Sequence, residues 1–226
     1  MNLIIFVTHD FKPLFIKTVT QIGLDHDGAK IVVLLDADAE CTVPSIEGVS
    51  ILRTKSKTTT FDDRTGLSML IEYFKTIDVL KYDYIWHFEN DVYHPEGLMK
   101  IIRYHEDVVC DLLVPEQGLR KSNWSWFSTL KGFDTIIRHG VLFVCGRMSP
   151  RLANRLKHGI DIEFSGFFEA LLPQLCYRYG YSIASFYPET LGTITTEQDL
   201  KAVQDVITRI ENGFAIDDKL HHPVKL

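Results

Sequence analysis

The stretch "YDYIWHFENDVYHPEG", residues 82–97, joins an apolar strand pattern directly to a group of charged and polar residues. Its residues 84–88 have the apolar character of a buried strand. The triplet Glu89-Asn90-Asp91 follows without a spacer. Pro95 then marks the expected first turn of a helix, where its missing N–H costs nothing. Two carboxylates and an amide therefore stand where a core strand is expected to end.

Strand and helix patterns alternate on both sides of this stretch. Apolar runs predict further strands, over residues 3–9, 29–38, 49–54, 110–116, 140–148 and 181–188. Periodic apolar faces and capping residues predict helices, over residues 13–23, 64–77, 95–107, 149–159, 165–180 and 197–213, before an irregular tail. This alternation predicts one α/β domain over residues 1–226, with a mostly parallel sheet and helices on both faces.

Acidic residues follow three of the predicted strands. The first strand ends in Thr8-His9-Asp10, the second in Asp36-Ala37-Asp38, and the strand of the opening stretch in Glu89-Asn90-Asp91. A single acidic residue directly after a strand is typical of a turn or a helix cap. Three exits at one edge of a sheet favour a binding site, because ligands of parallel α/β sheets lie beyond the carboxyl ends of the strands.

The spacing of these acids suits a divalent cation. Asp36 and Asp38, like Glu89 and Asp91, are two residues apart, so on extended backbone both members of a pair lie on one face. Mg²⁺ and Mn²⁺ prefer oxygen ligands and are commonly held by one or two carboxylates together with substrate phosphates. The sequence therefore predicts a cation and a phosphorylated ligand at this edge of the sheet.

Composition and charge exclude several other classes of protein. Apolar residues make up 46% of the 226 residues, and the net charge is −6, which is unlike the basic face of a protein that binds duplex nucleic acid. The four cysteines form no CxxC pair, which favours buried free thiols over a zinc site. The apolar start is too short for a membrane helix and lacks a signal-peptide pattern, so we expect a soluble, cytoplasmic protein without a membrane span.

The segment "YDYIWHFENDVY" resembles the metal-binding segment of GT-A-type nucleotide-sugar glycosyltransferases, in which an apolar strand ends in an acidic D-x-D-like triplet. The order of elements is also similar over most of the chain. The resemblance implies a GT-A-like (Rossmann-like) domain, with a nucleotide-sugar donor half over residues 1–115 and an acceptor half with a returning tail over residues 116–226. The triplet departs from the common form, because Glu89 stands at its first position.

The resemblance also implies roles for individual residues. Asp91 is expected to bind the metal directly, whereas Glu89 is expected to contact a ribose or a water, or to act as a further ligand. The residues implied in nucleotide-sugar binding are Thr8, His9, Asp10, Asp36, Arg64, Ser68, Glu89, Asn90 and Lys225. In the tail "LHHPVKL", His222 resembles the late metal ligand of these enzymes and Lys225 the diphosphate contact. An imidazole ligand suits Mn²⁺ better than Mg²⁺.

Sugar transfer with inversion also requires a base for the acceptor hydroxyl, and three acids are candidates. The expected base is Glu169, whose apolar neighbours in "SGFFEALL" would raise its pKa, with Glu163 and Asp161 as alternatives. A retaining enzyme would not need this base. Trp124 and Trp126 could offer aromatic faces to a glycan or glycoprotein acceptor, or could simply pack. The resemblance favours a UDP-sugar donor and leaves a GDP-sugar open.

Three other functions fit parts of the sequence. "VVLLDADAE" is similar to the nucleophile strand of haloacid-dehalogenase-type phosphatases through Asp36 and Asp38, although Glu40 stands where that family has Thr or Val. A non-catalytic nucleotide-sugar-binding module would tolerate the unusual triplet. A nucleotidylyltransferase would show a Gly-rich basic signature after the first strand, and "THDFKPLF" does not match it. A soluble glycosyltransferase would suit a bacterial polysaccharide enzyme, or a large virus acting in its host's cytoplasm.

Overall fold

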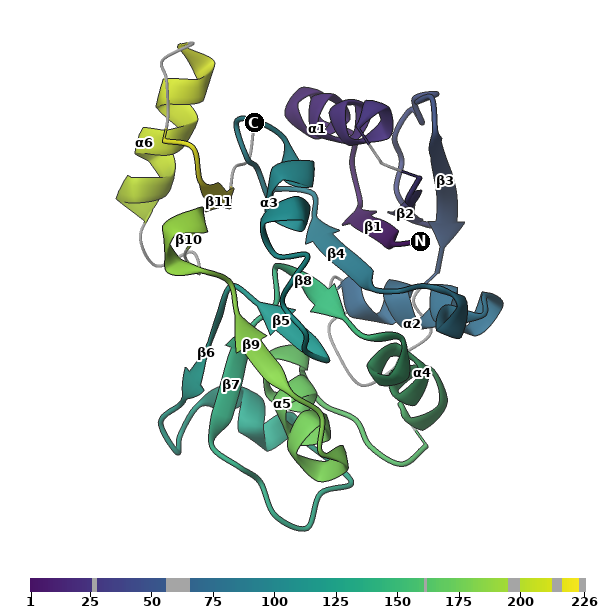
Figure 1. Ribbon diagram of the computed structural model, residues 1–226, viewed down its shortest axis with the longest axis vertical. Helices are drawn as coiled ribbons and strands as arrows, with labels where there is room; N and C mark the ends of the chain where they lie inside the picture. The colour runs from purple at the N-terminus through teal and green to yellow at the C-terminus, as the bar shows by residue number, and fades with distance from the viewer. Residues whose placement is uncertain (26–27, 56–65, 161, 195–199, 213–216, 224–226) are drawn as a thin grey trace.

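The computed structural model describes residues 1–25, 28–55, 66–160, 162–194, 200–212 and 217–223. The described chain contains a central seven-stranded sheet with the strand order β3-β2-β1-β4-β8-β5-β9 (Figure 1). Its strands are β1 (Leu3–Thr8), β2 (Lys30–Asp36), β3 (Val49–Thr54), β4 (Ile85–Glu89), β5 (Leu112–Val114), β8 (Cys145–Met148) and β9 (Ile183–Ser185). The strands β3, β2, β1 and β4 are parallel, and β5 is parallel to β9.

Only β8 runs against its neighbours within this sheet, pairing antiparallel with β4 and with β5. The predicted α/β class and mostly parallel sheet are therefore confirmed. Two small pairs lie outside the central sheet: β6 (Glu116–Leu119) with β7 (His139–Leu142), and β10 (Leu191–Ile194) with β11 (Leu220–His222).

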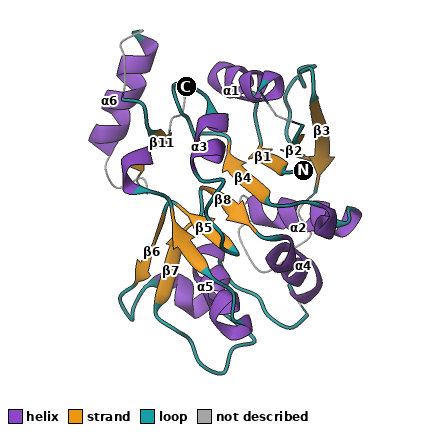
Figure 2. Cartoon of the chain, viewed as in Figure 1, coloured by secondary structure: helices purple, strands orange, loops and turns teal. Residues whose placement is uncertain are grey.

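Helices cover both faces of the sheet, as the alternating pattern predicts (Figures 1 and 2). One apolar core packs α1 (Pro13–Leu24) and α3 (Leu98–Tyr104) against one face, through side chains such as Ile4 and Phe6 of β1. The other core packs α2 (Gly66–Thr76), α4 (Pro150–Gly159) and α5 (Phe168–Tyr179) against the opposite face, through Leu3, Ile5 and Val7. The strict alternation along β1 follows from the two-residue period of a strand.

Three predicted elements differ from the structure. The run 140–148 forms two strands, because β7 pairs with β6 in the separate ribbon while β8 enters the central sheet. The run 110–116 likewise divides between β5 and β6. The helix expected to begin at Pro95 begins at Leu98, after a turn in which the N–H of Gly97 donates to the carbonyl of His94 at 3.0 Å. Gly97 has a φ of +87°, a conformation that favours glycine and precedes the helix.

The end of the described chain differs from the irregular tail that the sequence predicts. Helix α6 (Leu200–Glu211) is followed by the short strand β11, which returns to the body of the molecule beside α3 and the exit of β4 (Figure 1). Leu220 of β11 is fully buried in the core that also contains α1 and α3. The chain therefore brings residues near its C-terminus to the carboxyl edge of the sheet.

Within the described residues, no helix combines the length and apolar character that a membrane crossing requires. Cys110, Cys145 and Cys176 are buried free thiols, as predicted, and Cys41 is a partly exposed free thiol. These four cysteines, all in the described chain, form no disulfide.

Candidate functional site

Three strand exits with acidic residues lie side by side at the carboxyl edge of the sheet. β1 pairs in parallel with β2 on one side and with β4 on the other, and the pair Val7–Glu89 is the last of the β1–β4 register. The strand order changes direction between β1 and β4, and in open α/β sheets such a reversal leaves a crevice for a ligand. The edge predicted from the sequence is therefore present.

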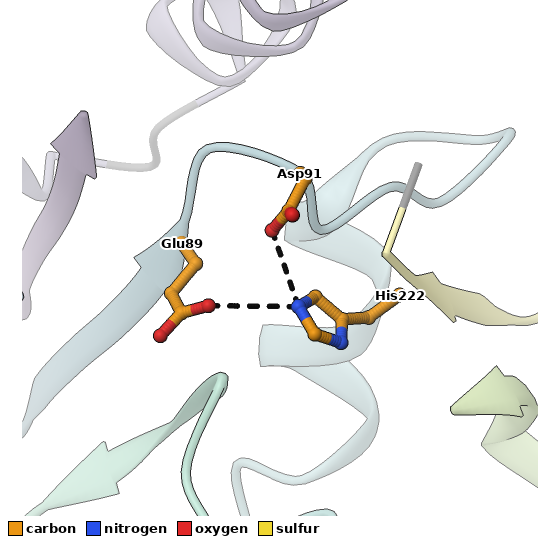
Figure 3. A group of neighbouring side chains, drawn as sticks. All are labelled: Glu89, Asp91 and His222. Atoms are coloured by element: carbon orange, nitrogen blue, oxygen red, sulfur yellow. Dashed lines mark ion pairs between the residues drawn. The ribbon is translucent and has the colours of Figure 1, made fainter. Parts of the chain in front are cut away.

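A tight turn after β4 places Asp91 next to Glu89. The N–H of Glu89 donates to the carbonyl of Val144 at 2.9 Å, which holds the strand end against β8. The N–H of Val92 then donates to the carbonyl of Glu89 at 3.2 Å and closes the turn. Both carboxylates thereby face the same side of the strand end (Figure 3).

His222 reaches these two carboxylates from β11, more than a hundred residues along the chain. Its Nε2 lies 3.2 Å from Asp91 Oδ1 and 3.5 Å from Glu89 Oε2 (Figure 3). Ligand atoms of all three side chains lie within 4.8 Å of one another, which makes them the one such His and acid group in the described parts of the chain. His222 is 8% exposed, so the surrounding residues restrict the position of its side chain.

The electrostatics of the group are dominated by the two carboxylates. Burial by itself would lower the pKa of His222, but hydrogen bonds and charge attraction from Asp91 and Glu89 outweigh burial and raise the pKa to about 9. At neutral pH the metal-free group therefore holds a proton on His222. A divalent cation would replace that proton between the same three side chains.

The donor set fits an octahedral divalent cation. Neighbouring ligands of such a cation, with bonds of about 2.1 Å, lie about 3 Å apart. The separations of 3.2 and 3.5 Å between His222 and the carboxylates are close to this value. Two carboxylate oxygens and one imidazole nitrogen leave room in a six-coordinate shell for phosphate oxygens or water.

Glu169 lies in the first turn of α5 and has an unusual environment for an acid. Burial raises the pKa of Glu169 to about 7; the Arg120 guanidinium opposes this change, and the Glu89 carboxylate adds to it. The preceding residue, Phe168, packs edge-on against Phe143 at a ring distance of 5.7 Å, which fixes the helix against the sheet side of the site. Glu169 thus titrates in the range that a general base needs.

The two alternative bases are in different situations. Glu163 is exposed and is engaged by Arg155, while the Tyr179 hydroxyl donates to it at 3.5 Å. The Glu163 carboxylate is therefore already occupied by a cation and a hydroxyl. Asp161 lies outside the described residues.

Four of the residues expected to contact the nucleotide lie at the carboxyl ends of β1, the strand next to β4, and of β2, the strand beyond β1. Thr8 is buried, and its hydroxyl accepts from the N–H of Asp10 at 3.1 Å, while Asp10 accepts from the N–H of Phe11 at 2.7 Å. His9 is exposed in this turn. Asp36 accepts from the N–H of Asp38 at 2.9 Å.

Four further residues are expected to contact the nucleotide, and two of them lie within the described chain. Ser68 is 3% exposed within α2. Arg64 and Lys225 lie outside the described residues, so their expected roles stay predictions. Asn90 lies in the turn between the two carboxylates and is partly exposed.

The two tryptophans have different surroundings. Trp126 stacks flat on Phe167 at 3.9 Å, so one face of its ring is covered by protein. Trp124 packs edge-on against Phe127 at 5.1 Å and lies under the Arg120 guanidinium at 5.6 Å. Both rings are partly exposed, on the side of the molecule formed by the β6–β7 ribbon and α5.

Sequence reasoning missed the charged pair beside Glu169. Arg120, just after β6, forms an ion pair with Glu116 at 2.9 Å, and both affect the pKa of Glu169. Nothing in the sequence around residues 116–120 distinguishes them from ordinary surface charges. Their proximity to Glu169 depends on the ribbon folding over the N-terminus of α5.

Comparison with known proteins finds likeness in backbone arrangement only. No protein-family model matches the chain, and no curated protein matches it. The glycosyltransferase GlyE from Streptococcus pneumoniae TIGR4 aligns with 100% of this chain and 55% of its own, at 10% identity and a TM-score of 0.43. The bifunctional IspDF from Campylobacter jejuni aligns with 89% of this chain and 53% of its own, at 14% identity and a TM-score of 0.48.

A third solved structure, A197 from STIV, aligns with 81% of this chain and 80% of its own, at 10% identity and a TM-score of 0.39. The chain spans about half the length of GlyE and of IspDF. Likeness at this level concerns the arrangement of strands and helices.

Proposed function

We propose that the protein is a metal-dependent glycosyltransferase, which moves a sugar from a nucleotide diphosphate sugar to a hydroxyl group of a glycan or glycoprotein. The observation that carries this proposal is the convergence of Glu89, Asp91 and His222 at the carboxyl edge of the sheet. The resemblance of "YDYIWHFENDVY" to the D-x-D segment of GT-A enzymes supports the same function.

Asp91 and His222 are the proposed ligands of Mn²⁺ or Mg²⁺, and Glu89 is the possible third ligand. When bound, the cation supplies Lewis-acid stabilisation of the departing diphosphate. The chain's own contribution is to hold these three side chains together from two distant segments. The buried imidazole of His222 and the turn at Asp91 keep them in place before a donor binds.

The nucleotide is proposed to lie along the exits of β1, β2 and β4. Asp36 at the end of β2 suits a hydroxyl-rich group such as a ribose, because its carboxylate accepts hydrogen bonds. The turn from Thr8 to Asp10 lies directly beside the exit of β4 and would contact the donor next to the cation. The proposed donor is a UDP-sugar, with a GDP-sugar as the alternative.

Glu169 is the proposed base for an inverting transfer. It would take the proton of the acceptor hydroxyl as that oxygen forms the new glycosidic bond and the bond from the sugar to the diphosphate breaks. A pKa of about 7 suits this task, since the carboxylate is then both present and basic near neutral pH. Trp124 and Trp126 are the proposed acceptor contacts on the same side.

The deciding experiment is nucleotide release from a panel of UDP- and GDP-sugars in the presence of Mn²⁺, with the wild type and Asp91→Asn. We expect release by the wild type and its loss in the variant. Asp107→Asn is the matched control, because Asp107 is an exposed acid away from the triplet. Full release by folded Asp91→Asn would exclude the proposed site.

The same assay separates the two alternatives. A nucleotide-sugar-binding module would bind donor and Mn²⁺ and release no nucleotide with any acceptor. A phosphatase would release phosphate from p-nitrophenyl phosphate and lose this activity in Asp36→Asn. The structure offers less for the phosphatase, because the described chain brings no further His or acid ligand to the Asp36–Asp38 pair.

A further inference from the structure

The C-terminal strand β11 is joined to the segment after Asp91 by a two-way backbone pair. The N–H of Tyr93 donates to the carbonyl of His221 at 2.9 Å, and the N–H of His221 donates to the carbonyl of Tyr93 at 2.8 Å. Tyr93 is two residues beyond Asp91, and His221 directly precedes His222. The separation of Asp91 and His222 therefore depends on how firmly β11 lies against residues 91–100.

A second set of contacts holds the chain just before β11. The carboxylate of Asp218 forms an ion pair with Lys100 of α3, and its Oδ1 lies 3.4 Å from His94 Nε2. Asp218, His94 and Lys100 are called the clasp below. None of the three belongs to the proposed cation site, yet together they tie the tail to the segment that carries Asp91.

The geometry of the clasp also sets the tautomer of His94. The N–H of Glu96 donates to His94 Nδ1 at 3.1 Å, so Nδ1 carries no proton and Nε2 carries one. The Nε2–H of His94 therefore points its donor at Asp218. His94 is 3% exposed, which makes it a rigid partner for the tail.

We infer that Asp218 is a positioning residue, whose contacts with His94 and Lys100 hold β11 in place and thereby hold His222 at the cation site. This inference rests on the proposed function, because it assigns the clasp a purpose in assembling that site. The expected consequence is simple. If the tail is docked for only a fraction of the time, the apparent cation affinity falls by that fraction.

Metal affinity measured on the full chain tests this inference directly. We would titrate Mn²⁺, followed by electron paramagnetic resonance of the free ion, into the wild type, Lys100→Met and Asp218→Ala. Both variants should bind Mn²⁺ about tenfold more weakly, the lower end of the range seen when groups that orient metal ligands are removed. Lys100→Arg should restore most of the affinity, because arginine can still pair with Asp218.

The Lys100 variant separates positioning from simple charge. Removing a cation near the site would tighten Mn²⁺ binding if electrostatics alone acted, whereas loss of the clasp weakens it. Glu96→Gln is the matched control, because the Glu96 side chain pairs with Lys100 at 2.5 Å, whereas the tail is tied to Lys100 through Asp218. This control should bind Mn²⁺ like the wild type.

Hydrogen exchange of the His221 and Tyr93 amides gives a readout that does not need the metal. Both amides should exchange faster in Lys100→Met and Asp218→Ala than in the wild type and in Glu96→Gln, without metal. Unchanged exchange and unchanged affinity in both variants would overturn this inference alone. Absence of Mn²⁺ binding by the wild type would overturn the proposed function as well.

Discussion

Two groups of charged side chains in this protein are each built around carboxylates and have different surroundings. Asp111, at the start of β5, accepts from Ser149 Oγ at 2.7 Å, from the N–H of Ser182 at 2.9 Å, and from Arg151 in a bidentate pair. Glu89 and Asp91 instead share one imidazole, that of His222, at 3.5 and 3.2 Å. The first carboxylate is held by hydroxyl, amide and guanidinium donors, whereas the second pair converges on an imidazole that could bind a metal.

This difference distinguishes an acid that joins parts of the fold from acids that are proposed to bind a cation. The donors of Asp111 come from α4 and from the approach to β9, so the carboxylate joins three parts of the fold and has no lone pair to spare for a ligand. The Glu89–Asp91 pair instead stands, with His222, in a group of side chains whose ligand atoms lie close enough together to hold a cation. The first arrangement should contribute stability and the second activity, and the four predictions below examine this division.

The largest expected effect is on catalysis, in Asp91→Asn. The amide keeps the shape of the side chain and loses the charge, so we expect donor turnover to fall about a thousandfold, in line with several kcal/mol of metal assistance. The free energy of unfolding should change by only about 1 kcal/mol, because one of two carboxylates around His222 remains. Nucleotide release and urea unfolding on the same samples check both numbers. A large loss of stability would place Asp91 with Asp111 instead.

Glu169→Gln should lower turnover by about a hundredfold or more while leaving Mn²⁺ affinity unchanged, because a base is lost and no proposed ligand is touched. For the wild type, kcat/KM should fall about tenfold per pH unit below about pH 7, where Glu169 becomes protonated. The pH profile of the variant should lack this fall in kcat/KM below about pH 7, which is the acid limb of the profile. Retention of the limb in the variant would assign it to another group.

Asp111→Asn should destabilise the fold by about 2–3 kcal/mol, because a hydrogen-bonded charge is removed and the donors around it lose their acceptor. Turnover per folded molecule should stay at the wild-type value. Urea unfolding measures the first quantity, and activity corrected for the folded fraction measures the second. A stable, inactive variant would contradict the structural role given to Asp111.

The smallest expected effect is a difference in the pH dependence of stability between the two groups. Burial alone would raise the pKa of Asp111, but hydrogen bonds from Arg151, Ser149 and Ser182 hold it well below its ordinary value of 3.8. The ionised Asp111 therefore contributes to the free energy of unfolding above about pH 4, and this contribution is lost as the pH falls. His222 has a raised pKa, so its contribution is complete below about pH 6.5 and is lost as the pH rises through about 9.

Urea midpoints measured between pH 2 and 10 in the presence of EDTA should show these opposite slopes. The difference in urea midpoint between the wild type and Asp111→Asn isolates the loss of stability at acid pH, called the acid limb. The difference between the wild type and His222→Gln isolates the loss at alkaline pH, called the alkaline limb. Mn²⁺ should abolish the alkaline limb in the wild type, because the cation replaces the proton. An alkaline limb that persists in His222→Gln would mean that other groups produce it.

Local sequence patterns predicted the elements of the fold better than their connections. Ser149 caps α4 as expected, accepting from the N–H of Leu152 at 3.3 Å, because a cap depends on residues a few positions apart. The division of residues 140–148 into β7 and β8 was not predictable in this way. No turn signal separates the two halves, and only pairing with β6 or with β4 decides where each belongs.

The sequence by itself determined the alternating α/β architecture and the placement of acids at three neighbouring strand exits, because both follow from short-range periodicity and from the direction of parallel strands. It also marked Asp91 and His222 as candidates by resemblance. Only the tertiary structure decided that Glu89, Asp91 and His222 meet, that Glu163 is occupied by Arg155, and that Asp218 ties the tail to α3. The contacts of His222 and Asp218 join segments far apart in the chain, at the place where β11 packs Leu220 into the core.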